Sequence, residues 1–192
     1  MTDHAAIAGE AVAVSCRSAP AQTARAHATL RQGVRFISGL APWAEPPAHG
    51  RQAVVRARYV GNCLRELDRF LALLLDAACE APRPRVLTLK PDTAERMGAY
   101  RHGGWDSRPA QDRLRALDRS RRCLLHEGGR VACPDVPGGW WLTAGWRATE
   151  SPDLRRYAVG AHLRPNAGDL RDIAHFYGGL GDRVVEGSSW HR

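Results

Sequence analysis

The residue types best suited to acid–base chemistry lie in one short run, from Arg119 to Gly129. It reads Arg-Ser-Arg-Arg-Cys-Leu-Leu-His-Glu-Gly-Gly, so that three arginines precede His126 by seven, five and four positions. Arginine stays protonated in proteins, whereas histidine titrates near neutral pH. Together such side chains can bind a phosphate and transfer a proton, which is the chemistry needed to cut RNA without a metal ion.

Helix phase and the apolar pattern favour different arginines as the partner of His126. In an ideal helix, seven steps place Arg119 nearly in line with His126, whereas the five steps from Arg121 turn it by about 140°. Arg121, however, falls among the leucines of the apolar side, where it requires a cleft, an interface or an ion pair. A helix often loosens in its last turn before glycine. We therefore predict Arg121 and His126 as the catalytic pair and keep Arg119 as the alternate.

Hydrophobic periodicity predicts a mainly helical fold around this run. Apolar residues recur at helical spacing over residues 22–38, 51–81, 91–100, 109–127 and about 166–184. Between the last two helices, over residues 136–163, aromatic and β-branched residues alternate or cluster around Gly, Thr and Pro. We expect a helical bundle with a small irregular or β-hairpin insertion before the last helix.

A length of 192 residues fits one domain of ordinary size. Residues 1–20 are rich in small side chains and predict a loosely ordered N-terminal arm. Residues 42–50 contain three prolines and indicate an irregular connection inside the domain. The predicted organisation is an arm over residues 1–20 and a single helical domain over residues 21–192.

The charge balance favours an acidic partner, although only mildly. The formal net charge is +8, but only Lys90 among the 28 basic residues is a lysine, and this arginine bias is also typical of GC-rich genomes. The five cysteines form no Cys-x-x-Cys pair or zinc-finger array. We expect no metal, no cofactor and no membrane segment, and the cysteine usage and the N-terminal composition favour a cytoplasmic location.

The run from Arg121 to His126, in a chain with this helix order, resembles the HEPN superfamily of helical RNases and RNA-binding proteins. The signature of that superfamily is an arginine, four to six residues, and a histidine, with a polar residue commonly following the arginine. Arg121 matches with four intervening residues and Arg119 with six, whereas Arg122 falls outside the spacing with three. Arg122 is the polar residue after Arg121. The similar order of helices extends over roughly residues 51–185.

This resemblance implies a metal-independent endoribonuclease in which two motifs face one cleft of a homodimer. The 2′-hydroxyl of RNA would attack the adjacent phosphorus, His126 would transfer a proton, and Arg121 or Arg119 would stabilise charge on the phosphate oxygens. Arg122 is expected to contact the RNA. The resemblance also implies a toxin or a defence or stress effector, with an antitoxin or regulatory protein as a further partner.

Two other classes of function stay open. In the first, a non-catalytic helical module binds RNA or protein; His126 then caps the helix end and Arg121 pairs with Glu127 or with a carboxylate on another helix. In the second, a helical domain acts on a small ligand, although the sequence contains no nucleotide-binding loop or nucleophile motif. Salt-dependent RNA binding without cleavage products would distinguish the first of these from a nuclease.

For several other residues we favour a structural role. Arg155 and Arg156 precede His162 at a similar interval, but in a strand-like segment, so we predict no site there. Tryptophans beside a hairpin fill a core more often than they stack on bases. We therefore expect Trp140 and Trp141 in the core. The polar residues between the leucines of the 51–81 helix are expected to form a solvated face, and His175 is expected in the core or at an interface.

Overall fold

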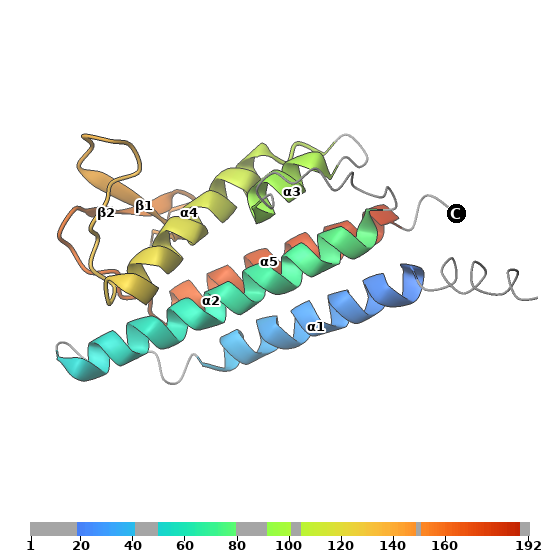
Figure 1. Cartoon of the computed structure of the whole chain (residues 1–192), viewed down its shortest axis with the longest axis horizontal. Helices are drawn as coiled ribbons and strands as arrows, with labels where there is room; N and C mark the ends of the chain where they lie inside the picture. Colours follow the sequence, from blue (N-terminus) through green and yellow to red (C-terminus); the bar gives the residue numbers. More distant parts are fainter. Residues whose placement is uncertain (1–18, 41–49, 80–91, 101–104, 149–150, 189–192) are drawn as a thin grey trace, which may run out of the picture.

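Five helices and one antiparallel hairpin form the described part of the chain in the computed structural model, namely residues 19–40, 50–79, 92–100, 105–148 and 151–188 (Figure 1). The elements are α1 (Ala19–Gly39), α2 (Arg51–Ala78), α3 (Thr93–Ala99), α4 (Arg108–His126), β1 (Trp141–Arg147), β2 (Leu154–Ala158) and α5 (Ala167–Ser188). The predicted fold class, mainly helical with a small hairpin before the last helix, is confirmed. Residues 1–18 of the predicted arm and residues 41–49 of the predicted connection lie outside the described residues.

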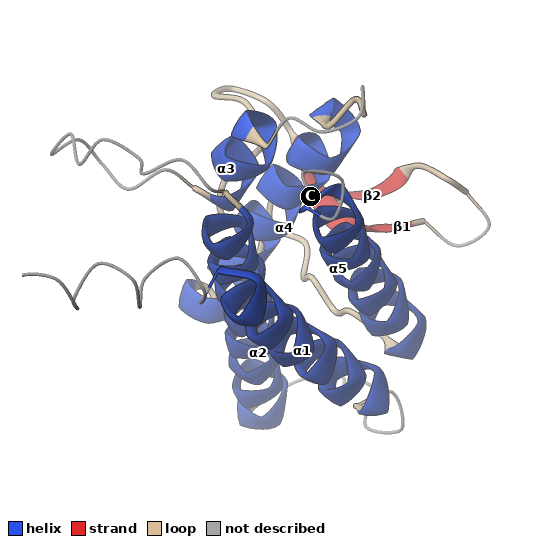
Figure 2. Ribbon diagram, turned by 90° about the vertical axis from the view of Figure 1, so that its right-hand side faces the viewer, coloured by secondary structure: helices blue, strands red, loops and turns tan. Residues whose placement is uncertain are grey.

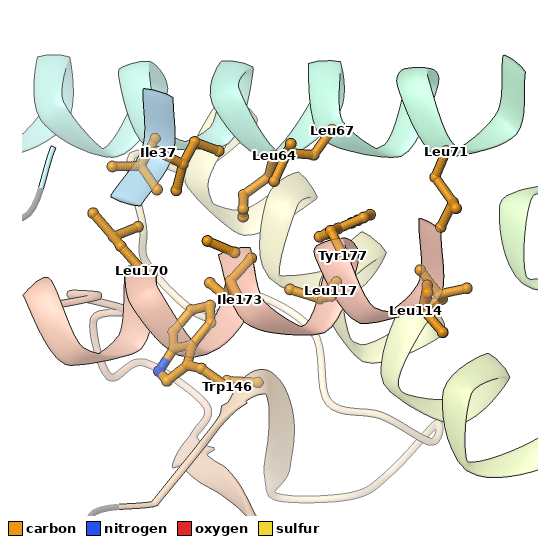
Figure 3. Close-up of a cluster of buried hydrophobic side chains, with 14 of the residues drawn as sticks. Ile37, Leu64, Leu67, Leu71, Leu114, Leu117, Trp146, Leu170, Ile173 and Tyr177 are labelled. Atoms are coloured by element: carbon orange, nitrogen blue, oxygen red, sulfur yellow. The ribbon is translucent and has the colours of Figure 1, made fainter. Parts of the chain in front are cut away.

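Helix α2 lies at the centre of the bundle and contacts α1, α4 and α5. Figures 1 and 2 show α1 and α2 side by side, with α5 against both and α4 on the other side of α2. The leucines of α2 recur every three or four residues, so they form one apolar stripe that is removed from water. Figure 3 shows Leu64, Leu67 and Leu71 of this stripe above Ile173 and Tyr177 of α5. Burial of each leucine stabilises the fold by about 1.5–3 kcal/mol.

The hairpin is attached to α4 by close backbone packing. A side chain at Gly145 of β1 would meet Leu117 of α4, because an added Cβ would lie 2.2 Å from Leu117 Cγ. The Gly145 N–H donates to the hydroxyl oxygen of Ser120 at 3.2 Å, and the Arg113 Nε donates to the Gly145 carbonyl at 3.0 Å. These contacts fix the hairpin against the middle of α4, next to the predicted motif.

Local chemistry sets the ends of α3 and of α4, the helix that carries the motif. Asp92 caps α3: its carboxylate accepts from the Glu95 N–H at 2.7 Å, while the Glu95 carboxylate accepts from the Asp92 N–H at 3.2 Å. Proline stands in the first turn of α4, where a missing N–H costs nothing. At its other end α4 stops at Gly128 and Gly129, which have φ values of 58° and 92° that favour glycine.

None of the described helices is long and apolar enough to span a bilayer.

Candidate functional site

One exposed face of α4 carries four basic side chains in a line, which we call the basic stripe: Arg115, Arg119, Arg122 and His126. Their spacing of four, three and four residues keeps them within about 60° around the helix axis, over a length of about 16 Å. Arg115, Arg122 and His126 are exposed, and Arg119 is half-buried. The stripe therefore presents three guanidinium groups and one imidazole along a single line to solvent.

The arginines of the stripe border a groove between α2, α3 and α4, with a volume of about 620 Å³. Its charged lining consists of seven arginines and four aspartates: Arg65, Arg69, Arg96, Arg115, Arg119, Arg121, Arg122, Asp68, Asp76, Asp92 and Asp118. The excess of guanidinium groups makes this groove attractive to an anion, because a concave surface of one sign focuses the field.

Arg121 does not point along the basic stripe but into the groove, toward α2. Its guanidinium forms an ion pair with Asp118, one turn earlier, and its Nη1 lies 3.7 Å from Asp68 Oδ2. Asp68 also accepts a hydrogen bond from the Thr93 hydroxyl at 3.0 Å, and burial raises the pKa of this carboxyl. Arg121 thus joins α4 to α2 and α3 through an ion pair. We expected a cleft, an interface or an ion pair for an arginine at this apolar position, and the structure shows the ion pair.

His126 lies in the exposed last turn of α4, which keeps its helical hydrogen bonds. The Cys123 carbonyl accepts from the N–H groups of Glu127 at 3.1 Å and of Gly129 at 2.9 Å. The loosened turn expected from sequence is therefore not present, and His126 keeps its helical phase. The structure consequently does not bring Arg121 and His126 into one pocket, since His126 is not among the groove residues; it aligns His126 with Arg119 and Arg122 instead.

Arg119 keeps part of its guanidinium available although it has an acidic neighbour. Its Nε lies 2.9 Å from Asp135 Oδ1, but the angle at this buried Nε does not allow a hydrogen bond. Within the described part of the chain, its two Nη groups have no hydrogen-bond partner. A phosphate can therefore bind the outer edge of this guanidinium without displacing an existing hydrogen bond.

The other two arginines of the stripe form ion pairs within α4. Arg122 Nη2 lies 2.7 Å from Asp118 Oδ2, and Arg115 Nη1 lies 3.0 Å from Asp112 Oδ1. Because both guanidinium groups are well exposed, each pair is worth about 0–1 kcal/mol. A bound phosphate can replace these carboxylates at little cost.

The sequence allowed Arg121 to pair with a carboxylate on another helix, which Asp68 of α2 provides, but it identified neither Asp68 nor Asp118. Asp118 stands three residues before Arg121 and four before Arg122, so helical spacing could have indicated it. Asp68 was expected on a solvated face, which is wrong: its side chain is 27% exposed and contacts α3 and α4. Only tertiary packing places Asp68 beside Arg121, so no local signal could have found it.

The residues predicted to have structural roles behave differently from one another. Arg155 Nη2 lies 3.2 Å from Asp169 Oδ1, and Asp169 is buried, so Arg155 has a structural partner. His175 is exposed on α5, which excludes the core as its place, and the other expected place, an interface, stays a prediction. The core role expected of Trp140 and Trp141 is also wrong, because these side chains are 77% and 48% exposed.

The described residues contain no group of three or more His, Cys, Asp or Glu side chains placed to hold a metal ion. Neither protein-family models nor curated proteins nor solved structures gave a match to this chain. The resemblance to the HEPN superfamily therefore stays a prediction from the motif and the helix order.

Proposed function

We propose that this protein binds RNA along the basic stripe of α4 and cleaves it without a metal ion. The alignment of Arg119 and Arg122 with His126 on one exposed helix face carries this proposal. A line of basic side chains about 16 Å long can follow several phosphates of one strand. The free Nη groups of Arg119 and the weak exposed ion pair of Arg122 leave both guanidinium groups available to phosphate.

In the proposed reaction, the ribose 2′-oxygen bonds to the adjacent phosphorus and the bond from phosphorus to the 5′-oxygen breaks. The products are a 2′,3′-cyclic phosphate and a 5′-hydroxyl. His126 accepts the 2′-proton or donates a proton to the leaving 5′-oxygen, while Arg119 and Arg122 stabilise the charge on the non-bridging oxygens. A two-fold homodimer would supply a second histidine for the other proton transfer. The HEPN resemblance adds a toxin or defence effector, controlled by a protein partner, to this proposal.

RNA binding without cleavage is the second candidate function. It is favoured by the ion pairs of Arg121, which engage the predicted catalytic arginine with Asp118 and Asp68. It is also favoured by the groove lining, which includes no histidine among the described residues. In this case the arginines of the stripe bind the RNA backbone, and His126 only caps the end of the helix.

Cleavage of a labelled single-stranded RNA in EDTA separates the two candidates. For a nuclease, His126→Ala lowers the cleavage rate by about 100-fold or more, the usual contribution of an acid–base group, while RNA affinity stays nearly unchanged. His175→Ala removes another exposed histidine and serves as the control. Cleavage by His126→Ala at the wild-type rate would exclude His126 as the proton-transfer group. Tight binding by the wild type without a cyclic-phosphate product would establish the second candidate.

The salt dependence of binding tests the stripe itself. For single-stranded RNA, each lost phosphate contact reduces the slope of log affinity against log salt by about 0.7. Arg119→Gln and Arg122→Gln should each produce this reduction. Arg35→Gln, at an exposed position of α1 away from the groove, should not. Equal slopes for all four proteins would place RNA binding elsewhere.

A further inference from the structure

Two adjacent tryptophans at the start of the hairpin are exposed, and the core of the protein does not require them. Trp140 is 77% exposed and Trp141 is 48% exposed, whereas Trp146 of the same strand is fully buried. The ring of Trp146 packs edge to face against Tyr157 of β2, with centroids 6.2 Å apart. The aromatic residue that anchors the hairpin to the core is therefore Trp146, and the surface pair is left without a packing role.

The backbone of the two exposed tryptophans is fixed by hydrogen bonds on both sides. The Trp140 carbonyl accepts from the Val159 N–H at 2.9 Å, and the Trp141 carbonyl accepts from the Asp135 N–H at 2.9 Å. Trp141 also lies opposite Ala158 in the ladder of β1 and β2. A fixed backbone and only two side-chain torsions each mean that these rings lose little entropy when a flat group stacks on them.

The surroundings of the tryptophan pair are basic. The Arg156 guanidinium lies 5.8 Å from the centroid of the Trp141 ring. Arg130 and His162 lie opposite each other in a neighbouring bridge, and both are exposed. Throughout the described residues, no carboxylate forms an ion pair with Arg130, Arg156 or His162. This combination of exposed indole rings and two arginines without a carboxylate partner among the described residues complements a ligand with flat bases and a negative backbone.

The tryptophan pair is connected to the basic stripe through Asp135. The Asp135 carboxylate lies against Arg119 and accepts from the N–H and hydroxyl of Thr143, while its own N–H donates to the Trp141 carbonyl. Hairpin and α4 are in direct contact, and Figure 1 shows the hairpin beside the last turns of α4. Asp135 therefore links the backbone of Trp141 directly to Arg119, the arginine of the stripe whose Nη groups have no partner among the described residues.

We propose that Trp140, Trp141 and Arg156 form a stacking site for unpaired bases of single-stranded RNA whose phosphates lie along the basic stripe. The inference rests on the proposed RNA binding by α4 and adds the class of substrate: an unpaired strand instead of a duplex. The bases stack on the indole rings, and the Arg156 guanidinium contacts the backbone between them.

Affinities of the full chain for a single-stranded RNA 12-mer and for the same sequence in a duplex test this site. The wild type should bind the single strand more tightly, with quenching of tryptophan fluorescence. A double variant that carries Trp140→Ala and Trp141→Ala should bind the single strand more weakly, by about 5- to 150-fold for each stacked base. Its binding of the duplex should stay nearly unchanged. Phe replacements at both positions should retain part of the affinity. Phe36→Ala removes a 55% exposed aromatic ring of α1 and should have no effect.

The outcomes separate this inference from the proposed function. Salt-dependent binding that is equal for both RNAs and unchanged in the double variant would overturn the stacking site while leaving RNA binding intact. No binding of either RNA by the wild type would overturn both. Sedimentation provides a further outcome: if the double variant dissociates a wild-type dimer and keeps its RNA affinity, the tryptophans form an interface between copies and the inference is wrong. A single-stranded DNA 12-mer bound as tightly as RNA would remove the restriction to RNA.

Discussion

The four basic residues of the sequence motif separate into two roles once their side chains are placed. Arg119, Arg122 and His126 share the exposed face of α4, as seven- and four-residue steps in a regular helix require. Arg121 lies about 140° from His126 and is enclosed by Asp118 and Asp68. Sequence spacing identified these residues but could not decide between the arginines. The decision depends on the geometry of the last turn of α4 and on the carboxylate that α2 places beside Arg121, and both are set by the packing of the folded chain.

Arg121→Gln tests whether this arginine has a structural role. The change leaves the half-buried Asp68 without its guanidinium neighbour, so we expect the free energy of unfolding to fall by about 1–3 kcal/mol in urea denaturation. Arg122→Gln removes an exposed ion pair and should cost less than about 1 kcal/mol. Asp68→Asn combined with Arg121→Gln should recover part of the loss. Unchanged stability with loss of RNA cleavage would instead make Arg121 catalytic, as its spacing from His126 alone suggests.

The helices could be predicted better than the hairpin, because the apolar pattern of a long helix repeats many times along the sequence. Ten apolar positions specify α2, and its observed end at Ala78 lies three residues before the predicted end at residue 81. In β1 only a few residues alternate: Leu142 and Ala144 are buried, whereas Trp141 faces outward. Sequence predicted that strands would form here, but composition alone assigned the tryptophans to the core. The packing of Gly145 on α4 has no local signature.

Gly145→Ala should separate the hairpin from α4. The added methyl group would lie 2.2 Å from Leu117 Cγ and 2.8 Å from its Cα, so the strand must move away. Overpacking of this kind costs about 1–3 kcal/mol or more, measurable by thermal or urea unfolding, and it should also weaken RNA binding by displacing Asp135 and the tryptophans. Gly179→Ala is the matched control: its Cβ meets nothing within 4 Å inside α5, so it should stabilise the protein by about 0.4–1 kcal/mol. Equal stability of both variants would contradict this packing.

An ionisable side chain, that of Tyr177, lies in the core shared by α2, α4 and α5. Tyr177 of α5 is 1% exposed and lies close to Leu67 of α2 and Leu117 of α4 in Figure 3. Complete burial, followed by the nearby Asp68 carboxylate, raises the pKa of Tyr177 well above its usual value of 10. The Tyr177 hydroxyl therefore stays protonated at a pH where the same group in the unfolded chain has ionised.

This difference predicts a loss of global stability at alkaline pH. Because the folded state retains a proton that the unfolded state releases, stability is unaffected by Tyr177 below pH 10 and falls above it, by at most about 1.4 kcal/mol per pH unit. Tyr177→Phe removes this dependence, so its free energy of unfolding should fall less steeply between pH 9 and pH 11 than that of the wild type. Tyr59→Phe, at a 46% exposed position of α2, should follow the wild type. Parallel curves for all three proteins would mean that the core opens to water before unfolding, and the closed packing of α2, α4 and α5 around Tyr177 would then be wrong.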